Sequence, residues 1–150
     1  MQPPPLDIPP GGLVVDLRLV RIRDAERATS TRLDAWIDHV QRAAEPCIVL
    51  DVALRLRSAS ASALVMLQPP GAPLGLPVIP HLFDLVSSAL EIGSPWHLPP
   101  VIAAQTGQQG RAIVRHRRAD GAIINVDVIG VPLYDHGQVI GAAGFLSQVQ

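Results

Sequence analysis

The clearest pattern in the chain lies in residues 111–146, RAIVRHRRADGAIINVDVIGVPLYDHGQVIGAAGFL. Runs of β-branched and apolar residues separated by polar links are typical of strands. The stretch therefore predicts three strands, at 111–118, 123–133 and 139–146. Glycine-containing links between them are typical of hairpins, so the three strands are expected to be antiparallel neighbours.

The first link, around Asp120-Gly121, also predicts a register. A three-residue loop with Gly121 in the left-handed conformation places Val114 opposite Val126. The same register pairs Ala112 with Val128 and Arg115 with Asn125. A slip of one residue would place Val114 against Asp127, so we favour the first register.

An amphipathic helix is predicted upstream, at 31–44. Thr31 and Asp34 have the spacing of a capping box, and Pro46 ends the pattern. Four apolar residues follow one stripe of this helix: Leu33, Trp36, Ile37 and Val40.

The middle of the chain alternates short strands and helices. Two strands are predicted at 47–51 and 53–58, with a turn made by Asp51. A short helix through Leu67 can be capped by Ser60 or Ser62. A loop follows at 68–80, then helices at 81–90 and 101–106, the second preceded by Pro99-Pro100 and ended by Gly107. This order of elements predicts an α+β fold.

Composition limits the classes of protein that the chain can belong to. The 150 residues are 48% hydrophobic and 17% charged, with a net charge of −1, which is typical of one globular domain. Such a charge argues against a nucleic-acid or membrane-surface binder. The single cysteine excludes an internal disulfide, and the start of the chain lacks a signal-peptide pattern, so a cytoplasmic location is expected.

The chain is expected to have three parts. Residues 1–12 hold five prolines and predict a disordered tail. Residues 13–45 form an N-terminal extension, with an alternating stretch at 13–19 that fits a strand but also has helical spacing, followed by the helix at 31–44. Residues 46–150 form the domain itself.

Residues 45–147 resemble a PAS domain. Residues 45–51, EPCIVLD, resemble the family's opening strand and turn, and 71–85 resemble its loop into short helices. Residues 115–121 resemble its hairpin entry, and 126–141 its closing strands. The resemblance implies a five-stranded antiparallel sheet in the order 2-1-5-4-3, with short helices on one face and a ligand cavity between them. It also implies that a helix before the first strand mediates dimerisation, a place that 31–44 occupies.

The resemblance does not extend to the family's cofactors. Flavin-binding members need a reactive cysteine after the short helices, whereas Cys47 lies in the first predicted strand. Haem-binding members have a histidine where Gln105 stands here, and His97 comes too early. We therefore expect no cofactor, and a colourless protein. The five histidines have no paired metal-binding spacing, and no acid–base pair is evident, so neither a metal site nor an enzyme is expected.

Two sites follow from the resemblance. The expected ligand pocket is lined by Val49, Leu64, Leu67, Leu82, Leu85, Val101, Ile102, Val114 and Val126. The expected homodimer interface is the helical stripe of Leu33, Trp36, Ile37 and Val40. In both cases the alternative is that these residues fill the core of one chain.

The favoured function is a stand-alone PAS-type sensory or protein-interaction module that binds a small apolar ligand or a regulatory protein partner. The alternative is a ligand-free structural dimerisation or adaptor domain. His116 is expected to point toward the core, where one hydrogen bond would satisfy its ring. Asp127 is expected on a solvated face.

Overall fold

A computed structural model of the chain describes residues 29–86 and 98–150, and the structural statements below refer to these residues. The predicted tail at 1–12 and the strand or helix at 13–19 lie outside them. No helix in the described ranges is both long and apolar enough to cross a membrane.

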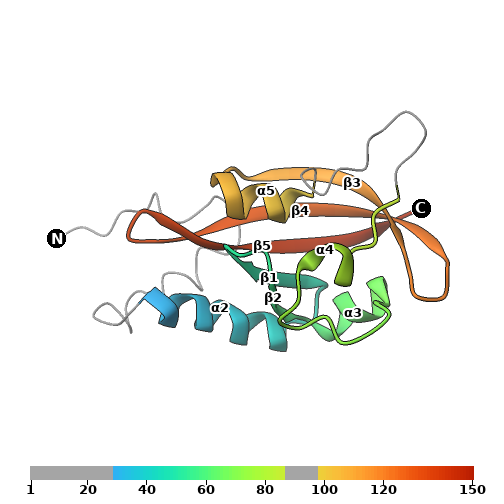
Figure 1. Cartoon of the computed structure of the whole chain (residues 1–150), viewed down its shortest axis with the longest axis horizontal. Helices are drawn as coiled ribbons and strands as arrows, with labels where there is room; N and C mark the ends of the chain where they lie inside the picture. The colour runs from blue at the N-terminus through green and yellow to red at the C-terminus, as the bar shows by residue number, and fades with distance from the viewer. Residues whose placement is uncertain (1–28, 87–97) are drawn as a thin grey trace.

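The core of the molecule is one five-stranded antiparallel sheet in the order β2-β1-β5-β4-β3, as predicted (Figure 1). The strands are β1 Cys47–Asp51, β2 Leu56–Ala59, β3 Gly110–Arg117, β4 Ile123–Asp135 and β5 Gln138–Val149. The three C-terminal strands are the longest and form two successive hairpins, while β1 adds to the free edge of β5. The patterned stretch at 111–146 therefore supplies most of the sheet.

The predicted register of the first hairpin is confirmed. Val114 lies opposite Val126, and the flanking pairs Ala112–Val128 and Arg115–Asn125 are also those predicted. Gly121 has a φ of 90°, in the left-handed region that a side chain disfavours. The loop chemistry and the alternation of the strands thus agree on one pairing.

Four helices complete the described fold: α2 Thr29–Arg42, α3 Ala61–Leu67, α4 Val78–His81 and α5 Pro99–Thr106. Helix α2 begins two residues before the predicted start, so Thr31 lies inside it and is not its cap. Ser60 caps α3, since its hydroxyl accepts a hydrogen bond from Ala63 N at 3.2 Å. Gly107 ends α5 with a φ of 73°, as expected.

The predicted helix at 81–90 is wrong for its described part. The helical turn comes earlier, at α4, and the segment 82–86 runs alongside β3 instead. Leu85 forms a bridge with His116, and Val86 N donates to Arg115 O at 2.8 Å. Contacts with the sheet have overridden the local helical spacing. Residues 87–90 of that prediction lie outside the described ranges.

The second strand also begins later than the predicted 53–58. Asp51 makes the expected turn, because its Oδ1 accepts hydrogen bonds from the backbone N–H groups of Ala53 and Arg55, at 3.0 and 3.1 Å. Leu54 adopts a positive φ of 66° within this turn. The strand can therefore start only at Leu56.

Both faces of the sheet are covered by buried apolar side chains. The inner cluster, beneath α3, α4 and α5, consists of Ile48, Leu50, Leu56, Ala63, Leu67, Val78, Leu82, Phe83, Leu98, Val101, Ala103, Ala104, Ile124, Val126, Val128, Ala142 and Leu146. The outer cluster, beneath α2, consists of Leu33, Trp36, Val40, Cys47, Val49, Leu133 and Ala143. Successive strand residues alternate between the two clusters.

Helix α5 lies directly on the sheet because of two glycines. A Cβ on Gly130 of β4 would collide with the backbone of Pro99 and Pro100. A Cβ on Gly144 of β5 would lie 2.9 Å from both the Pro100 side chain and Ile48 Cγ1. These positions remove the side-chain layer under the start of α5, so the helix approaches the strands closely.

Candidate functional site

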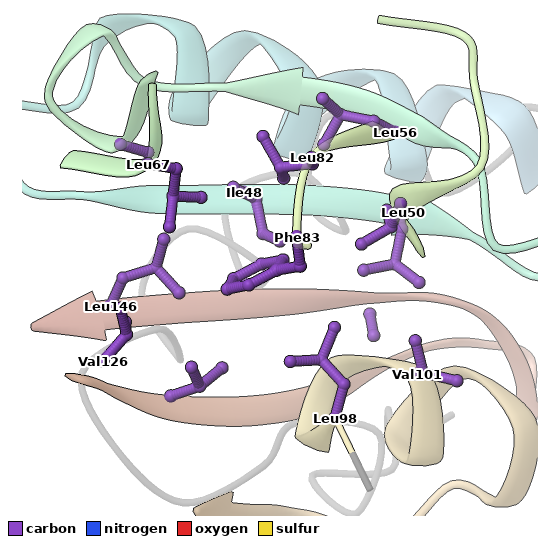
Figure 2. Close-up of a cluster of buried hydrophobic side chains, with 14 of the residues drawn as sticks. Ile48, Leu50, Leu56, Leu67, Leu82, Phe83, Leu98, Val101, Val126 and Leu146 are labelled. Atoms are coloured by element: carbon purple, nitrogen blue, oxygen red, sulfur yellow. The ribbon is translucent and has the colours of Figure 1, made fainter. Parts of the chain in front are cut away.

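The inner cluster is the candidate ligand-binding region. Its floor is the sheet, and its cover is made by three short helices and the extended segment 82–86. Figure 2 shows Phe83 near the middle of these side chains, with Ile48 on one side and Leu98 on the other. Phe83 is fully buried. The cover therefore depends on short elements and loops, whereas the floor is a continuous hydrogen-bonded sheet.

Seven of the nine predicted pocket residues contact this cluster. Leu67, Leu82, Val101 and Val126 are buried members, while Leu64, Leu85 and Val114 pack against it partly exposed. The structure thus brings together residues from α3, the segment after α4, α5, β3 and β4. Whether they enclose a ligand stays a prediction.

Two predicted pocket residues lie elsewhere. Val49 was assigned to the wrong face: it belongs to the outer cluster under α2, because its neighbours Ile48 and Leu50 are the β1 residues that point inward. Ile102 is half-buried on α5 and belongs to neither cluster. The turn of α5 that faces the sheet contains Val101, Ala103 and Ala104 instead.

Sequence reasoning missed several inner residues. They include Ile48, Leu50, Phe83, Leu98 and Leu146. Strand geometry allows only one of the sets Ile48/Leu50 and Cys47/Val49 to point inward, but all four residues are apolar, so the sequence does not show which set it is. No local pattern identified Phe83, because the helix predicted at 81–90 does not form at this residue.

His116 is the one buried histidine among the described residues, with 1% of its surface exposed. It lies on β3, and both ring nitrogens have partners. Nε2 lies 2.6 Å from Leu67 O, and Nδ1 accepts a hydrogen bond from Asp84 N at 3.1 Å. The ring also meets Phe83 edge-on, with centroids 5.7 Å apart. His116 points inward as expected, but with two hydrogen bonds in place of the one predicted.

The α2 stripe packs on its own sheet. Leu33, Trp36 and Val40 are buried in the outer cluster, and Ile37 packs against it partly exposed. The stripe was predicted either to form a homodimer interface or to fill the core of one chain. In the structure it packs within one chain. Trp36 Nε1 is buried without a hydrogen-bond partner in the described part of the chain. A dimer through this helix stays a prediction, and it would need another arrangement of α2 or its remaining exposed side.

The outer face of β3 and β4 lies beyond the α2 stripe. Arg111 of β3 and Asp127 of β4 form an ion pair there, and Ile113, which lies opposite Asp127 in the sheet, is 62% exposed. Hydrogen bonding from Arg111 holds the pKa of Asp127 below its usual value. Asp127 had been expected only on a solvated face. The structure pairs it with Arg111 instead.

Cys47 is buried in the outer cluster. Burial raises the pKa of its thiol, and the Ser60 hydroxyl opposes this effect by hydrogen bonding. In the described residues, no three His, Cys, Asp or Glu side chains lie close enough together to hold a metal ion.

Comparison with known proteins identifies the architecture. No family model and no curated protein sequence matches the chain. Solved structures do match. A variant of the LOV protein RsLOV has a TM-score of 0.62 and 14% identity over 81% of this chain and 70% of its own. The LOV domain of a blue-light activated histidine kinase from Erythrobacter litoralis has a TM-score of 0.57 and 15% identity, covering 72% and 98%.

A PAS domain from Colwellia psychrerythraea also matches, with a TM-score of 0.54 and 16% identity over 78% of this chain and 96% of its own. Together with the strand order, these matches settle the architecture. The chain has the PAS fold. At these identities the likeness concerns the fold alone, and the resemblance noted in the sequence is confirmed at that level.

The described inner face does not fit a flavin or a haem. A flavin ring needs hydrogen-bond partners along its polar edge. Of the described buried polar side chains beside the inner cluster, the Ser60 hydroxyl already bonds to Glu45 O and Ala63 N, and the other is His116. Both of its nitrogens already bond to the protein, so it is also unsuited to bind haem iron. Cys47 lies on the opposite face of the sheet. The described residues instead offer an almost purely apolar surface.

Proposed function

We propose that this PAS domain is a sensory module without catalytic activity, and that the inner cluster binds a small apolar ligand. The observation that supports this most is the composition of that cluster. Seventeen buried apolar residues meet there, and among the described residues the buried polar side chains beside them are His116 and Ser60, the cap of α3. A site of this kind recognises hydrocarbon or aromatic groups by burial and shape.

The construction of the cover supports a sensor rather than a rigid scaffold. Leu82 and Phe83 enter the cluster directly after the single turn of α4, and Leu98 enters at the start of α5. Short elements with few backbone hydrogen bonds open at lower free energy than a sheet. A ligand under them would change the population of cover conformations, and a regulatory protein partner would detect that change.

The test is mass spectrometry of small molecules released by denaturing the purified, full-length protein. A defined apolar compound in stoichiometric amount supports the proposal. The matched control is the same extraction from an unrelated protein purified in parallel, which removes contaminants common to both. An empty wild-type protein, which also fails to bind any member of a panel of fatty acids and aromatic hydrocarbons, contradicts it.

The alternative function is a ligand-free adaptor, and one observation favours it. Ile113 is 62% exposed and Ile123 is 45% exposed, on the same side of neighbouring strands as the Arg111–Asp127 ion pair. Exposed apolar side chains next to charged ones are typical of protein-interaction surfaces. If the adaptor function is correct, Ile113→Glu will weaken self-association or partner binding while leaving the fold intact.

A further inference from the structure

His116 joins three separate segments of the fold. Its Nε2 lies 2.6 Å from the carbonyl oxygen of Leu67, the last residue of α3. Its Nδ1 accepts from the backbone N–H of Asp84 at 3.1 Å. The imidazole itself belongs to β3. A single side chain therefore holds both α3 and the segment 82–86 against the edge strand of the sheet.

These two hydrogen bonds specify the protonation state of the ring. A backbone N–H can only donate, so Nδ1 must be unprotonated to accept from Asp84. A carbonyl can only accept, so Nε2 must carry the proton that it donates to Leu67. The geometry thus requires a neutral imidazole in one tautomer. A proton added at Nδ1 would face the Asp84 N–H, and that hydrogen bond would be lost.

We propose that His116 is a proton-sensitive latch, and that its protonation releases the segment 82–86 from β3. Two further hydrogen bonds depend on the same contact: Arg117 N donates to Asp84 O at 2.9 Å, and Val86 N donates to Arg115 O at 2.8 Å. Release would also withdraw Leu82 and Phe83 from the inner cluster. The proton would therefore control access to the apolar interior. This latch does not depend on whether a ligand binds there.

The charged groups around the ring do not remove this sensitivity. From the segment 82–86, the Asp84 carboxylate favours the charged imidazole, but it also pairs with Arg117 Nη1 at 3.7 Å. From the end of β3, Arg118 opposes the charge. Helix α3 has no charged residue, and the facing β4 residue is Ile124. Burial has the largest effect, and it lowers the pKa of His116 below the usual 6.5.

The direction of the effect follows from linkage. A histidine with a lowered pKa in the closed state binds its proton more readily when the segment opens. The closed state is therefore fully favoured above about pH 6.5, the value of an unperturbed histidine, and loses its advantage as the pH falls below it. With one proton involved, the ratio of open to closed molecules rises by at most about tenfold for each pH unit in that window.

The experiment is hydrogen exchange followed by NMR on the full chain, from about pH 7.5 to about pH 5. Each amide exchange rate is divided by the intrinsic exchange rate of an unprotected amide at the same pH. In the wild type, we expect the protection of the Asp84, Val86 and Arg117 amides to fall as the pH is lowered, by at most about tenfold for each pH unit. The protection of the Val128 and Ala143 amides, in the central strands, should not change over this pH range. Equal loss at all five amides would indicate global unfolding and would overturn the latch.

Two variants and one direct titration complete the test. In His116→Gln the side chain cannot titrate, so protection of the Asp84 and Val86 amides should no longer depend on pH. The matched control is His81→Gln, which removes an exposed histidine on the neighbouring α4 and should keep the wild-type slope. If His116→Gln fails to fold, an NMR titration of the histidine rings in the wild-type protein tests the latch instead. A His116 ring that titrates at or above about pH 6.5, the value of an unperturbed histidine, would overturn the proposal.

Discussion

Arg32 on α2 and Asp135 at the end of β4 form an ion pair, with Arg32 Nη2 3.4 Å from Asp135 Oδ1. Only 10% of the arginine side chain and 4% of the aspartate side chain are exposed. Arg32 Nη1 also donates to Tyr134 O at 2.9 Å. This contact joins residues 103 positions apart and fixes the first turns of α2 to the β4–β5 hairpin.

Asp135→Asn should therefore destabilise the domain strongly. The substitution removes the carboxylate charge from a largely buried ion pair, and breaking such a pair costs about 3–5 kcal/mol in comparable cases. The measurement is the urea midpoint followed by circular dichroism. Asp38→Asn is the matched control, because Asp38 pairs with Arg42 on the exposed side of the same helix and should cost at most about 0.5 kcal/mol. Equal effects of the two variants would show that α2 is not held by the buried pair.

Trp36→Ala tests how the α2 stripe is used. The side chain is 1% exposed within one chain, so truncation should cost about 3–5 kcal/mol of stability even at protein concentrations where the chain is monomeric. Asp34→Ala, on the exposed side of the same helix, should change stability by less than about 0.5 kcal/mol.

Light scattering on the same samples gives the oligomeric state. A dimer that dissociates in Trp36→Ala without loss of monomer stability would contradict packing within the chain and favour the interface predicted from the sequence. A wild-type monomer at tens of micromolar would remove the homodimer altogether.

Gly121→Val should lower the stability by about 1–2 kcal/mol, because a β-branched residue is strained at the φ of 90° found here. Gly71→Val is the matched control: Gly71 has equally open surroundings, and its φ is not in the left-handed region. The urea midpoints of both variants provide the measurement. If the two shift equally, the hairpin loop does not have the described conformation.

Cys47 should react slowly with a thiol reagent in the native protein. The side chain is 1% exposed, and burial raises the pKa of its thiol. The comparison is the rate for the same protein in denaturant. A native rate equal to the unfolded rate would show that the outer cluster does not protect this residue.

The sequence was sufficient for the hairpin of β3 and β4, because the loop chemistry of Gly121 and the pairing of Val114 with Val126 require the same register. It was insufficient where distant contacts decide. The segment 82–86 has helical spacing, but it bonds to β3, a contact that no local pattern contains. Val49 was placed on the wrong face because an apolar strand buried on both sides has no alternation to read.

The central claim, a ligand site in the inner cluster, is tested most directly by two neighbouring alanines of β5. Ala142 lies in the inner cluster and Ala143 in the outer cluster, and both are fully buried. The measurement is the amount of small molecule per chain released from Ala142→Leu and from Ala143→Leu, with the urea midpoint of each.

If the inner cluster is a ligand site, Ala142→Leu will fill it and lose the bound compound. Ala143→Leu will keep the compound, although overpacking under α2 costs about 1–3 kcal/mol. A compound retained equally by both variants, or none released by the wild type, would contradict the account.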